Sequence, residues 1–340
     1  MAWPVHRVPR LDALRDLLTA ALVAGLAACA EPPAEVAGDS VEWSARAPIA
    51  SGPRLEAAVV AHGGLVYVIG GFDSPTHVTG AVAIYDPATD AWREGARMPQ
   101  ALHHVSAVAV GGRVVVTGGL RLDFSPTGVV AIYDPAADRW ESGAPMPAGT
   151  ERGAAAVGVV GDEVMVAGGS RDDAVDLVSS YSPANDRWTE RAPLPAAAYH
   201  GVAVSAGGAL YVIGGLSAGL LDGSSRAMAD VLRYDPDADA WVPRAPMPTP
   251  RGGCAAGVVD GLIVCAGGEA DRTYHGGIAP ETEAYDPVTD TWSALPPMRT
   301  PRGGTAGAAV DGRLYVPGGA RKLAFAPLDV NEAFDPLGRP

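Results

Sequence analysis

The sequence lacks several features that would point to a particular chemistry. Its 340 residues include three cysteines, and it contains neither a His-x-x-x-His pair nor a paired-cysteine motif. We therefore expect no metal site and no cofactor. Basic residues are too few to balance the acids, and the formal net charge is −14. Such an acidic surface repels nucleic acid and anionic lipid, so nucleic acid is excluded as a partner.

What the sequence has in abundance is glycine, and its glycines recur at regular distances. A two-residue turn of Gly or Asp stands seven residues before each of six Gly-Gly pairs, and such turns join tight hairpins because they tolerate positive φ. The steps between the pairs are 48, 50, 46, 53 and 51 residues, which predicts six repeats. The pairs are Gly70-Gly71, Gly118-Gly119, Gly168-Gly169, Gly214-Gly215, Gly267-Gly268 and Gly318-Gly319.

The second half of five of the repeats carries a Tyr and a Trp that stand seven residues apart. Between them lies a proline, which cannot donate to a strand ladder, and then small polar residues that favour a turn. Each repeat is thus expected to form four short antiparallel strands, the blade of a β-propeller, with Tyr and Trp packed between blades. The five segments read YDPATDAW, YDPAADRW, YSPANDRW, YDPDADAW and YDPVTDTW.

The ends of the array predict how the ring closes. The sixth repeat stops at Phe334-Asp335-Pro336 without a Trp strand, whereas Trp43 starts the array with no Tyr-Asp-Pro ahead of it. Pairing the two ends in one sheet removes the open seam that repeat arrays must otherwise cap. We therefore expect an all-β, six-bladed propeller over residues 41–340, closed by the strand around Trp43.

These motifs resemble the Kelch family, over roughly residues 41–336. The resemblance implies a Kelch-type propeller, and it leaves function open, because such propellers include protein-binding modules, sugar-processing enzymes and scaffolds. Kelch-type copper radical oxidases need a tyrosine and histidine ligand set with a crosslinking cysteine, and no such set is assignable here.

The first part of the sequence reads as an export signal. Arginines precede an apolar run from Leu17 to Ala28, which is too short to span a bilayer. The residues before Cys29 resemble the bacterial lipobox, so residues 1–28 are expected to be a signal peptide, Cys29 the lipidated residue, and residues 29–40 a tether. The expected location is the bacterial cell envelope, held to a membrane by lipid alone; an ordinary signal peptide, with a periplasmic or secreted protein, is the alternative.

Cys254 and Cys265 are the other two cysteines. With a two-residue turn at Asp260-Gly261, Ala256 faces Cys265 and Cys254 lies diagonal to it. Diagonal neighbours are usually too far apart for an unstrained disulfide, so buried thiols are expected.

The candidate ligand site lies on the face with the long loops. Between each second Gly and the following Tyr or Phe are 13, 13, 11, 18, 16 and 14 residues, whereas the turns on the opposite face do not vary. Sixteen residues before the Gly-Gly pair, four repeats carry arginine, and the other two have histidine two residues later. We predict that this set lines the channel mouth and binds an anion; the alternative is that the arginines are structural. The set is Arg54, His104, Arg152, His200, Arg251 and Arg302.

The function expected from these features is that of a binding module for a protein or an acidic glycan. The alternative is a sugar enzyme similar to the sialic acid mutarotases. The Kelch resemblance implies this option because those enzymes are also Kelch propellers with six blades. Ring opening of a sugar needs only a general acid and a general base, which one sequence can conceal. No catalytic residue is assignable.

Overall fold

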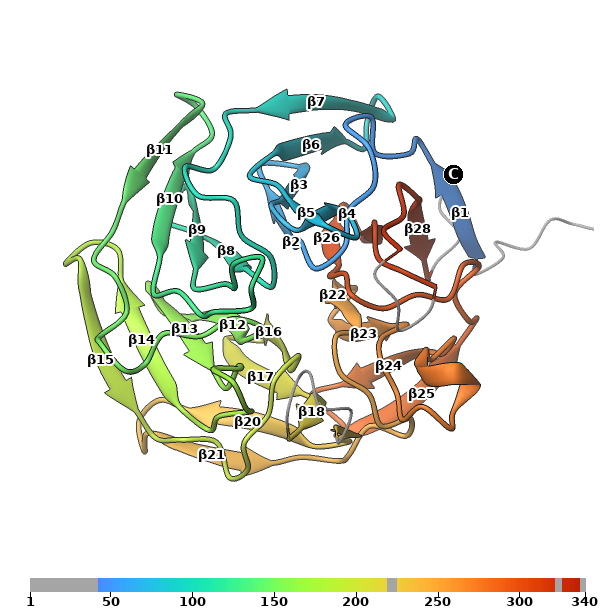
Figure 1. The fold of residues 1–340 in the computed structure, drawn as a ribbon. Coiled ribbons are helices and arrows are strands. Elements are labelled where there is room, and N and C mark those ends of the chain that lie inside the picture. The colour runs from blue at the N-terminus through green and yellow to red at the C-terminus, as the bar shows by residue number, and fades with distance from the viewer. Residues whose placement is uncertain (1–41, 219–224, 322–325, 337–340) are drawn as a thin grey trace, which may run out of the picture. The chain divides into compact units, whose positions relative to one another are not determined.

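The computed structural model describes residues 42–218, 225–321 and 326–336. In this part of the chain six four-stranded antiparallel sheets stand around a central axis, so the six-bladed all-β propeller is confirmed (Figure 1). The predicted signal peptide, Cys29 and the whole tether lie outside the described residues. Among the described residues, no helix is long and apolar enough to cross a membrane.

Each blade runs from an inner strand at the axis to an outer strand at the rim. Blade one contains β2 (Ala58–His62), β3 (Leu65–Ile69), β6 (Val82–Asp86) and β7 (Ala91–Gly95), with the small hairpin β4 (Phe72–Ser74) and β5 (His77–Val78). Blade two contains β8 (Ser106–Val110), β9 (Arg113–Thr117), β10 (Val130–Asp134) and β11 (Arg139–Ser142). Blade three contains β12 (Ala156–Val160), β13 (Glu163–Ala167), β14 (Val178–Ser182) and β15 (Arg187–Arg191).

The second half of the ring repeats this order. Blade four contains β16 (Val202–Ala206), β17 (Ala209–Ile213), β20 (Val231–Asp235) and β21 (Ala240–Pro243), with the short pair β18 (Leu216–Ser217) and β19 (Arg226–Ala227). Blade five contains β22 (Ala255–Val259), β23 (Leu262–Ala266), β24 (Thr282–Asp286) and β25 (Thr291–Leu295), with the 3-10 turn η1 (His275–Gly277). Blade six contains β26 (Ala308–Val310), β27 (Arg313–Pro317) and β28 (Asn331–Asp335).

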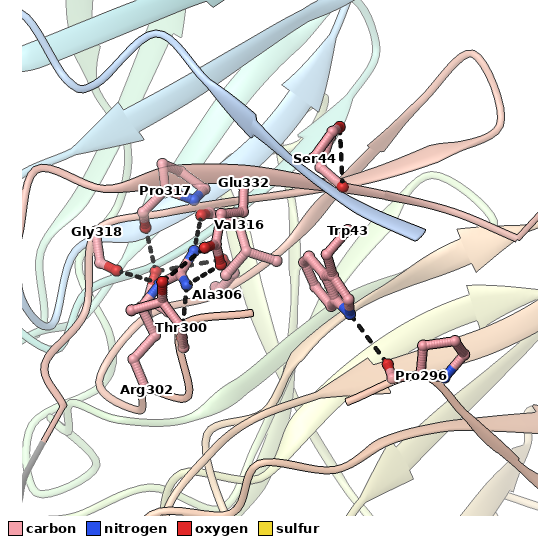
Figure 2. A network of polar contacts seen from close by, with 12 residues as sticks. Trp43, Ser44, Pro296, Thr300, Arg302, Ala306, Val316, Pro317, Gly318 and Glu332 are labelled. Atoms are coloured by element: carbon pink, nitrogen blue, oxygen red, sulfur yellow. Dashed lines mark hydrogen bonds and ion pairs between the residues drawn. The ribbon is translucent and has the colours of Figure 1, made fainter. Parts of the chain in front are cut away.

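The ring closes through β1 (Glu42–Arg46), which is the outer strand of blade six. It pairs antiparallel with β28, and Trp43 stands opposite Phe334. The Trp43 indole nitrogen donates to the carbonyl of Pro296, 3.1 Å away in the neighbouring blade (Figure 2). The predicted closure by the two ends of the array is therefore confirmed.

The Gly-Gly pairs are required where one blade meets the next. Gly118 has φ 61°, and a Cβ there would lie 2.1 Å from the Arg152 carbonyl oxygen of the following blade. The amide of Gly119 donates to that same oxygen at 3.0 Å. A side chain at Gly118 would therefore collide with backbone and strain its own conformation.

The Tyr and Trp residues join blades, as expected, and an aspartate in the turn completes the joint. The Tyr85 hydroxyl donates to Asp90 at 2.6 Å, and the Ala47 amide donates to the same oxygen at 2.9 Å. The Trp92 indole nitrogen donates to the Ala47 carbonyl at 2.8 Å. Asp90 thus serves as an acceptor, and Trp92 as a donor, for the backbone of Ala47 in the segment that follows β1.

The expectation of free thiols is wrong, because Cys254 and Cys265 form a disulfide. Ala256 does face Cys265, as the turn predicted. Cys254, however, precedes β22 and follows Gly253, whose φ is 57°, so the spacing of a regular extended strand does not apply to it. The two Cα atoms lie 5.5 Å apart, within the range of ordinary disulfides.

Candidate functional site

One position in every repeat brings its residue to the mouth of the central channel. It lies two residues after the predicted arginine position, just before the innermost strand, and all six of its residues have a left-handed φ between 51° and 66°. Four of them are not glycine, although this region is costly for residues with a Cβ. The six residues are Glu56, His104, Ala154, His200, Gly253 and Gly304.

Backbone hydrogen bonds link these six residues around the axis. The amides of five of them, all except Gly304, donate to the carbonyl of the equivalent residue in the preceding blade at 2.6–2.9 Å. The ring of backbone is thus held at a fixed diameter, and its side chains meet at the channel. Below them lies a cavity of about 160 Å³, lined mainly by small residues such as Ala57, Ala155 and Thr305.

Three of the ring side chains are polar and come together. Oε2 of Glu56 lies 3.5 Å from Nε2 of His104 and 3.7 Å from Nε2 of His200. The two imidazole rings stack, with centroids 5.0 Å apart and planes at 16°. The exposed fractions of the three side chains are 13%, 3% and 8%. Two imidazoles and a carboxylate therefore share a nearly dry site built from three different blades.

Two further residues hold the outer edges of the histidine rings. His103 lies beside His104, with their Nδ1 atoms 2.5 Å apart, and its own Nε2 is 2.7 Å from the Arg121 carbonyl oxygen. On the other side, Oε2 of Glu269 is 3.4 Å from Nδ1 of His200. Both imidazoles at the axis thus have an outer partner that fixes their orientation.

Burial and neighbouring charge shift the pKa values of this cluster in different directions. Burial raises the pKa of Glu56 to about 7. Burial alone would lower the pKa of His200, but Glu56 and Glu269 outweigh it and raise that pKa to about 9. Burial lowers the pKa of His103 to about 4 and, together with the nearby histidines, lowers that of His104 well below its usual value. At neutral pH His103 and His104 are therefore uncharged.

The four predicted arginines lie elsewhere, inside the blades. Each is at most 2% exposed. Arg302 donates to the carbonyls of Gly318 and Thr300 at 2.8 Å, to that of Val316, and to Glu332 (Figure 2). Arg152 likewise donates to the carbonyls of Gly168, Thr150 and Val166. These guanidinium groups satisfy loop and strand carbonyls and do not point into the channel.

The prediction of one mouth-lining ring of six basic side chains is therefore wrong in its geometry. The structure brings His104 and His200 to the axis and keeps the arginines Arg54, Arg152, Arg251 and Arg302 in the blade interior. The prediction assumed that the arginine position and the histidine position two residues later point to the same side, as they would on a regular strand. The left-handed residue at the ring position breaks that regularity, so the two positions face different surroundings.

Three of the four arginines pair with the side chain two residues before the Tyr or Phe of their own blade, and for Arg152 this is the Ser179 hydroxyl at 2.9 Å. Arg54 is the exception, because Ala83 stands at that position of its blade and its guanidinium donates to the Pro53 carbonyl at 2.8 Å instead. Arg251 pairs with Glu283 at 2.7 Å, and Arg302 pairs with Glu332. In blade two both positions are apolar, and Leu102 and Ala131 belong to one hydrophobic cluster. Blade two therefore fills with apolar side chains the space that the arginine and its partner fill in blades five and six.

The long-loop face outside this cluster carries exposed arginines and two large apolar side chains. Leu122 is 54% exposed and Tyr274 is 37% exposed, and both belong to loops that follow a Gly-Gly pair. Exposed arginines of the same loops are Arg121, Arg226, Arg272 and Arg321. Tyrosine and arginine are enriched in protein interfaces relative to the rest of the surface.

Reasoning from the sequence missed Glu56, His103 and Glu269 as site residues. No local motif contains them together, because they come from different blades. An alignment of the six repeats on the Gly-Gly pairs places Glu56 in register with His104 and His200 and exposes the polar trio. Glu269 and His103 have no such signal, since their roles depend on contacts with His200 and with the Arg121 carbonyl that only the folded chain brings about.

Comparison with known proteins identifies the family. The Kelch motif matches residues 53–99, 101–147, 151–195, 197–248 and 250–299, so the chain belongs to the Kelch-repeat family. It is 33% identical to Kelch-like protein terF of Aspergillus terreus over 307 residues, which cover 86% of this chain and 55% of terF. It is 34% identical to Kelch-like protein 15 of Danio rerio over 110 residues, 32% of this chain and 17% of that protein.

The chain thus spans about half the length of the fungal relative, and a smaller share of the fish protein. Among solved structures, that of YjhT matches with a TM-score of 0.67 and 16% identity, covering 84% of this chain and 96% of YjhT. At that identity the likeness shows the fold alone. The chain is thus a Kelch-type propeller, a fold that is widely used for protein interaction, and the fold by itself does not give the function.

Proposed function

We propose that this chain is a binding module that recognises another protein with its long-loop face. The observation that carries the proposal is the exposure of Tyr274 and Leu122 on loops whose lengths vary between blades, beside exposed arginines. Such loops stand on a rigid ring, and the binding residues of a scaffold lie disproportionately on loops of this kind.

A site-specific photo-crosslinker tests which face meets the partner. We would place the photoreactive amino acid at Tyr274, and in a matched variant at Val288, which is 89% exposed in a turn on the opposite face. Both variants would be produced in the native cell and irradiated. Discrete adducts from position 274 with none from position 288 are the expected result. Adducts only from position 288, or the same adducts from both, would contradict the proposal.

An acidic glycan is the second ligand class for the same face. Arginines suit it because their guanidinium groups bind carboxylates through paired hydrogen bonds. Polysialic acid is a defined probe, with binding followed by fluorescence anisotropy at two salt concentrations. Replacing Arg121 and Arg272 by serine should abolish binding, and replacing Arg139 and Arg187, which are exposed on the opposite side, should not. Equal effects of both replacements would exclude a glycan site here.

The runner-up is a sugar enzyme similar to the sialic acid mutarotases. The buried cluster of Glu56 and His200 favours it, because shifted pKa values supply an acid and a base in one cavity. The size of that cavity argues against it, since about 160 Å³ is below the roughly 300 Å³ at which pockets for small molecules begin. Proton NMR of a reducing sialic acid decides the matter: accelerated exchange between the α and β anomers is expected only of an enzyme.

We also infer that the protein is exported and anchored by lipid on Cys29. The disulfide between Cys254 and Cys265 supports export, because such bonds persist in oxidising compartments. Cys29→Ser should release the protein from membranes and abolish labelling by a fatty-acid probe. Release without loss of labelling, or labelling that persists in the variant, would contradict the anchor.

A further inference from the structure

We propose that Glu56, His104 and His200 form a binding site for a divalent first-row transition-metal ion such as Zn²⁺. The ligand atoms are Nε2 of each histidine and a carboxylate oxygen of Glu56. This site is distinct from the proposed interaction surface, and it departs from the expectation of no metal site stated in the sequence analysis.

The spacing of the three ligand atoms fits a metal ion. They all lie within 4.8 Å of one another, and the Glu56 oxygen is 3.5 Å and 3.7 Å from the two nitrogens. Zinc lies about 2.0–2.1 Å from nitrogen and oxygen ligands, so at tetrahedral angles two ligand atoms are about 3.4 Å apart. The Glu56 oxygen is within a few tenths of an ångström of that spacing from both nitrogens, and the two histidine nitrogens lie within 4.8 Å of each other.

The hydrogen-bond relay behind His104 turns a lone pair toward Glu56. A carbonyl oxygen only accepts, so His103 donates its Nε2 proton to Arg121, and the neutral ring then accepts at Nδ1. The donor to that Nδ1 is the Nδ1 proton of His104, which leaves Nε2 of His104 unprotonated. An imidazole lone pair and a carboxylate oxygen then face each other in a nearly dry site. A cation between them resolves this contact.

His200 supplies the second, independent observation. Its side chain is 8% exposed, and neither ring nitrogen makes a hydrogen bond of ordinary geometry among the described residues, although a carboxylate oxygen lies near each of them. Buried polar atoms without a well-formed hydrogen bond are rare and call for an explanation. Glu269 lies 3.4 Å from Nδ1, the position of the carboxylate that orients a metal-bound histidine, while Nε2 points to Glu56.

The other ring positions leave room for the ion and its water. Ala154, Gly253 and Gly304 put no long side chain into the channel, and a Cβ on Gly304 would lie 2.8 Å from Oε1 of Glu56. The cavity of about 160 Å³ holds about five waters at roughly 30 Å³ each. Three protein ligands with open positions for water are the arrangement of an accessible metal site.

The donor set selects the class of ion. Two imidazoles and one carboxylate favour zinc, iron, nickel or cobalt, whereas calcium and magnesium prefer oxygen ligands alone. The ring of backbone hydrogen bonds fixes the Cα positions of all three ligands, so the site is largely formed before the ion binds.

The test is metal binding by the whole chain after removal of bound ions with a chelator. Calorimetry with Zn²⁺ should give one ion per chain, and Co²⁺ should give visible absorption bands of low coordination symmetry. His104→Ala and His200→Ala should each weaken Zn²⁺ binding by more than about 100-fold, and Glu269→Gln by about 10- to 100-fold. His77→Ala is the matched control, because His77 contacts Asp73 on the surface at 2.7 Å, and it should leave binding unchanged.

Circular dichroism of each variant shows whether the fold is kept. If the two ligand variants do not fold, Glu269→Gln still decides, because Glu269 is not a ligand. A folded wild-type protein that binds neither Zn²⁺ nor Co²⁺ saturably would overturn the proposal and leave a shared proton as the explanation of the cluster. Binding lost in His77→Ala but kept in His104→Ala, or unchanged in Glu269→Gln, would overturn it equally.

Discussion

The buried ion pair of blade six offers a sharp test of whether the repeat arginines are structural. Arg302 and Glu332 have side chains that are 0% and 3% exposed. Glu332 also accepts from the Thr300 hydroxyl at 2.7 Å. Replacing Arg302 by leucine leaves that carboxylate buried without its cation, and it removes the donor from three carbonyls.

The magnitude follows from the cost of an unpaired buried charge. Removing one partner of a buried pair costs about 3–5 kcal/mol, whereas an exposed pair contributes about 0–1 kcal/mol. Blade two already places Leu102 and Ala131 at the equivalent positions. The double variant Arg302→Leu with Glu332→Ala copies that apolar pair, so it should lose less stability than either single variant.

Urea unfolding followed by tryptophan fluorescence measures these differences. We expect Arg302→Leu to lower the free energy of unfolding by about 3–5 kcal/mol, and the matched surface variant Arg139→Leu, which breaks a pair with Glu141, by no more than about 1 kcal/mol. Partner binding by the long-loop face should be unaffected in all variants. A loss below 1 kcal/mol for Arg302→Leu, or a double variant that loses the sum of the two, would refute the reasoning.

Three further predictions concern the joints between blades. Trp43→Ala should lower the free energy of unfolding by about 3–5 kcal/mol in urea, because it opens the closing strand; an unchanged value would contradict closure by β1. Gly118→Ala should lower the melting temperature far more than Gly111→Ala, since both have positive φ but only Gly118 has an atom within 4 Å of the added Cβ. The Tyr133 hydroxyl and the Ala96 amide hold the pKa of Asp138 below its usual 3.8, so its contribution to stability is full above that pH and lost as pH falls through the lowered pKa. Asp138→Asn should therefore cost stability at pH 7, and the difference from wild type should shrink in acid unfolding series below pH 3.8; a constant difference would count against it.

The fold was predictable because it is repeated. Six copies of the glycine-rich hairpin turn and five of the Tyr-to-Trp turn give independent readings of the same strand order, and the orphan Trp43 strand specifies the closure. The disulfide was not predictable from that register. Cys254 lies one residue outside β22, where Gly253 leaves the extended conformation, and strand geometry no longer sets the distance.

The candidate site was predictable only in part. His104 and His200 were found because their two repeats lack the arginine that the other four carry. The arginines themselves, however, lie inside the blades and not at the axis. A repeat arginine points into its blade because the ring residue two positions later adopts a left-handed φ. The sequence of a single repeat does not reveal that conformation. Glu56 was hidden because its own repeat keeps the arginine, so nothing in that repeat looked irregular.

A propeller brings equivalent positions of its repeats together at the axis, and this has a consequence for how such chains acquire sites. At the rim, equivalent residues lie far apart, so each repeat motif makes the same joint in each blade. At the axis, six equivalent residues converge, and three substitutions in different repeats suffice to assemble one cluster. Glu56, His104 and His200 are such substitutions in a ring otherwise made of alanine and glycine, at a backbone conformation that costs of order 1–3 kcal/mol for a residue with a side chain. A chemical site at the axis of this fold therefore needs only a few substitutions at the ring position. The variable loops can differ independently of that site and bind a partner.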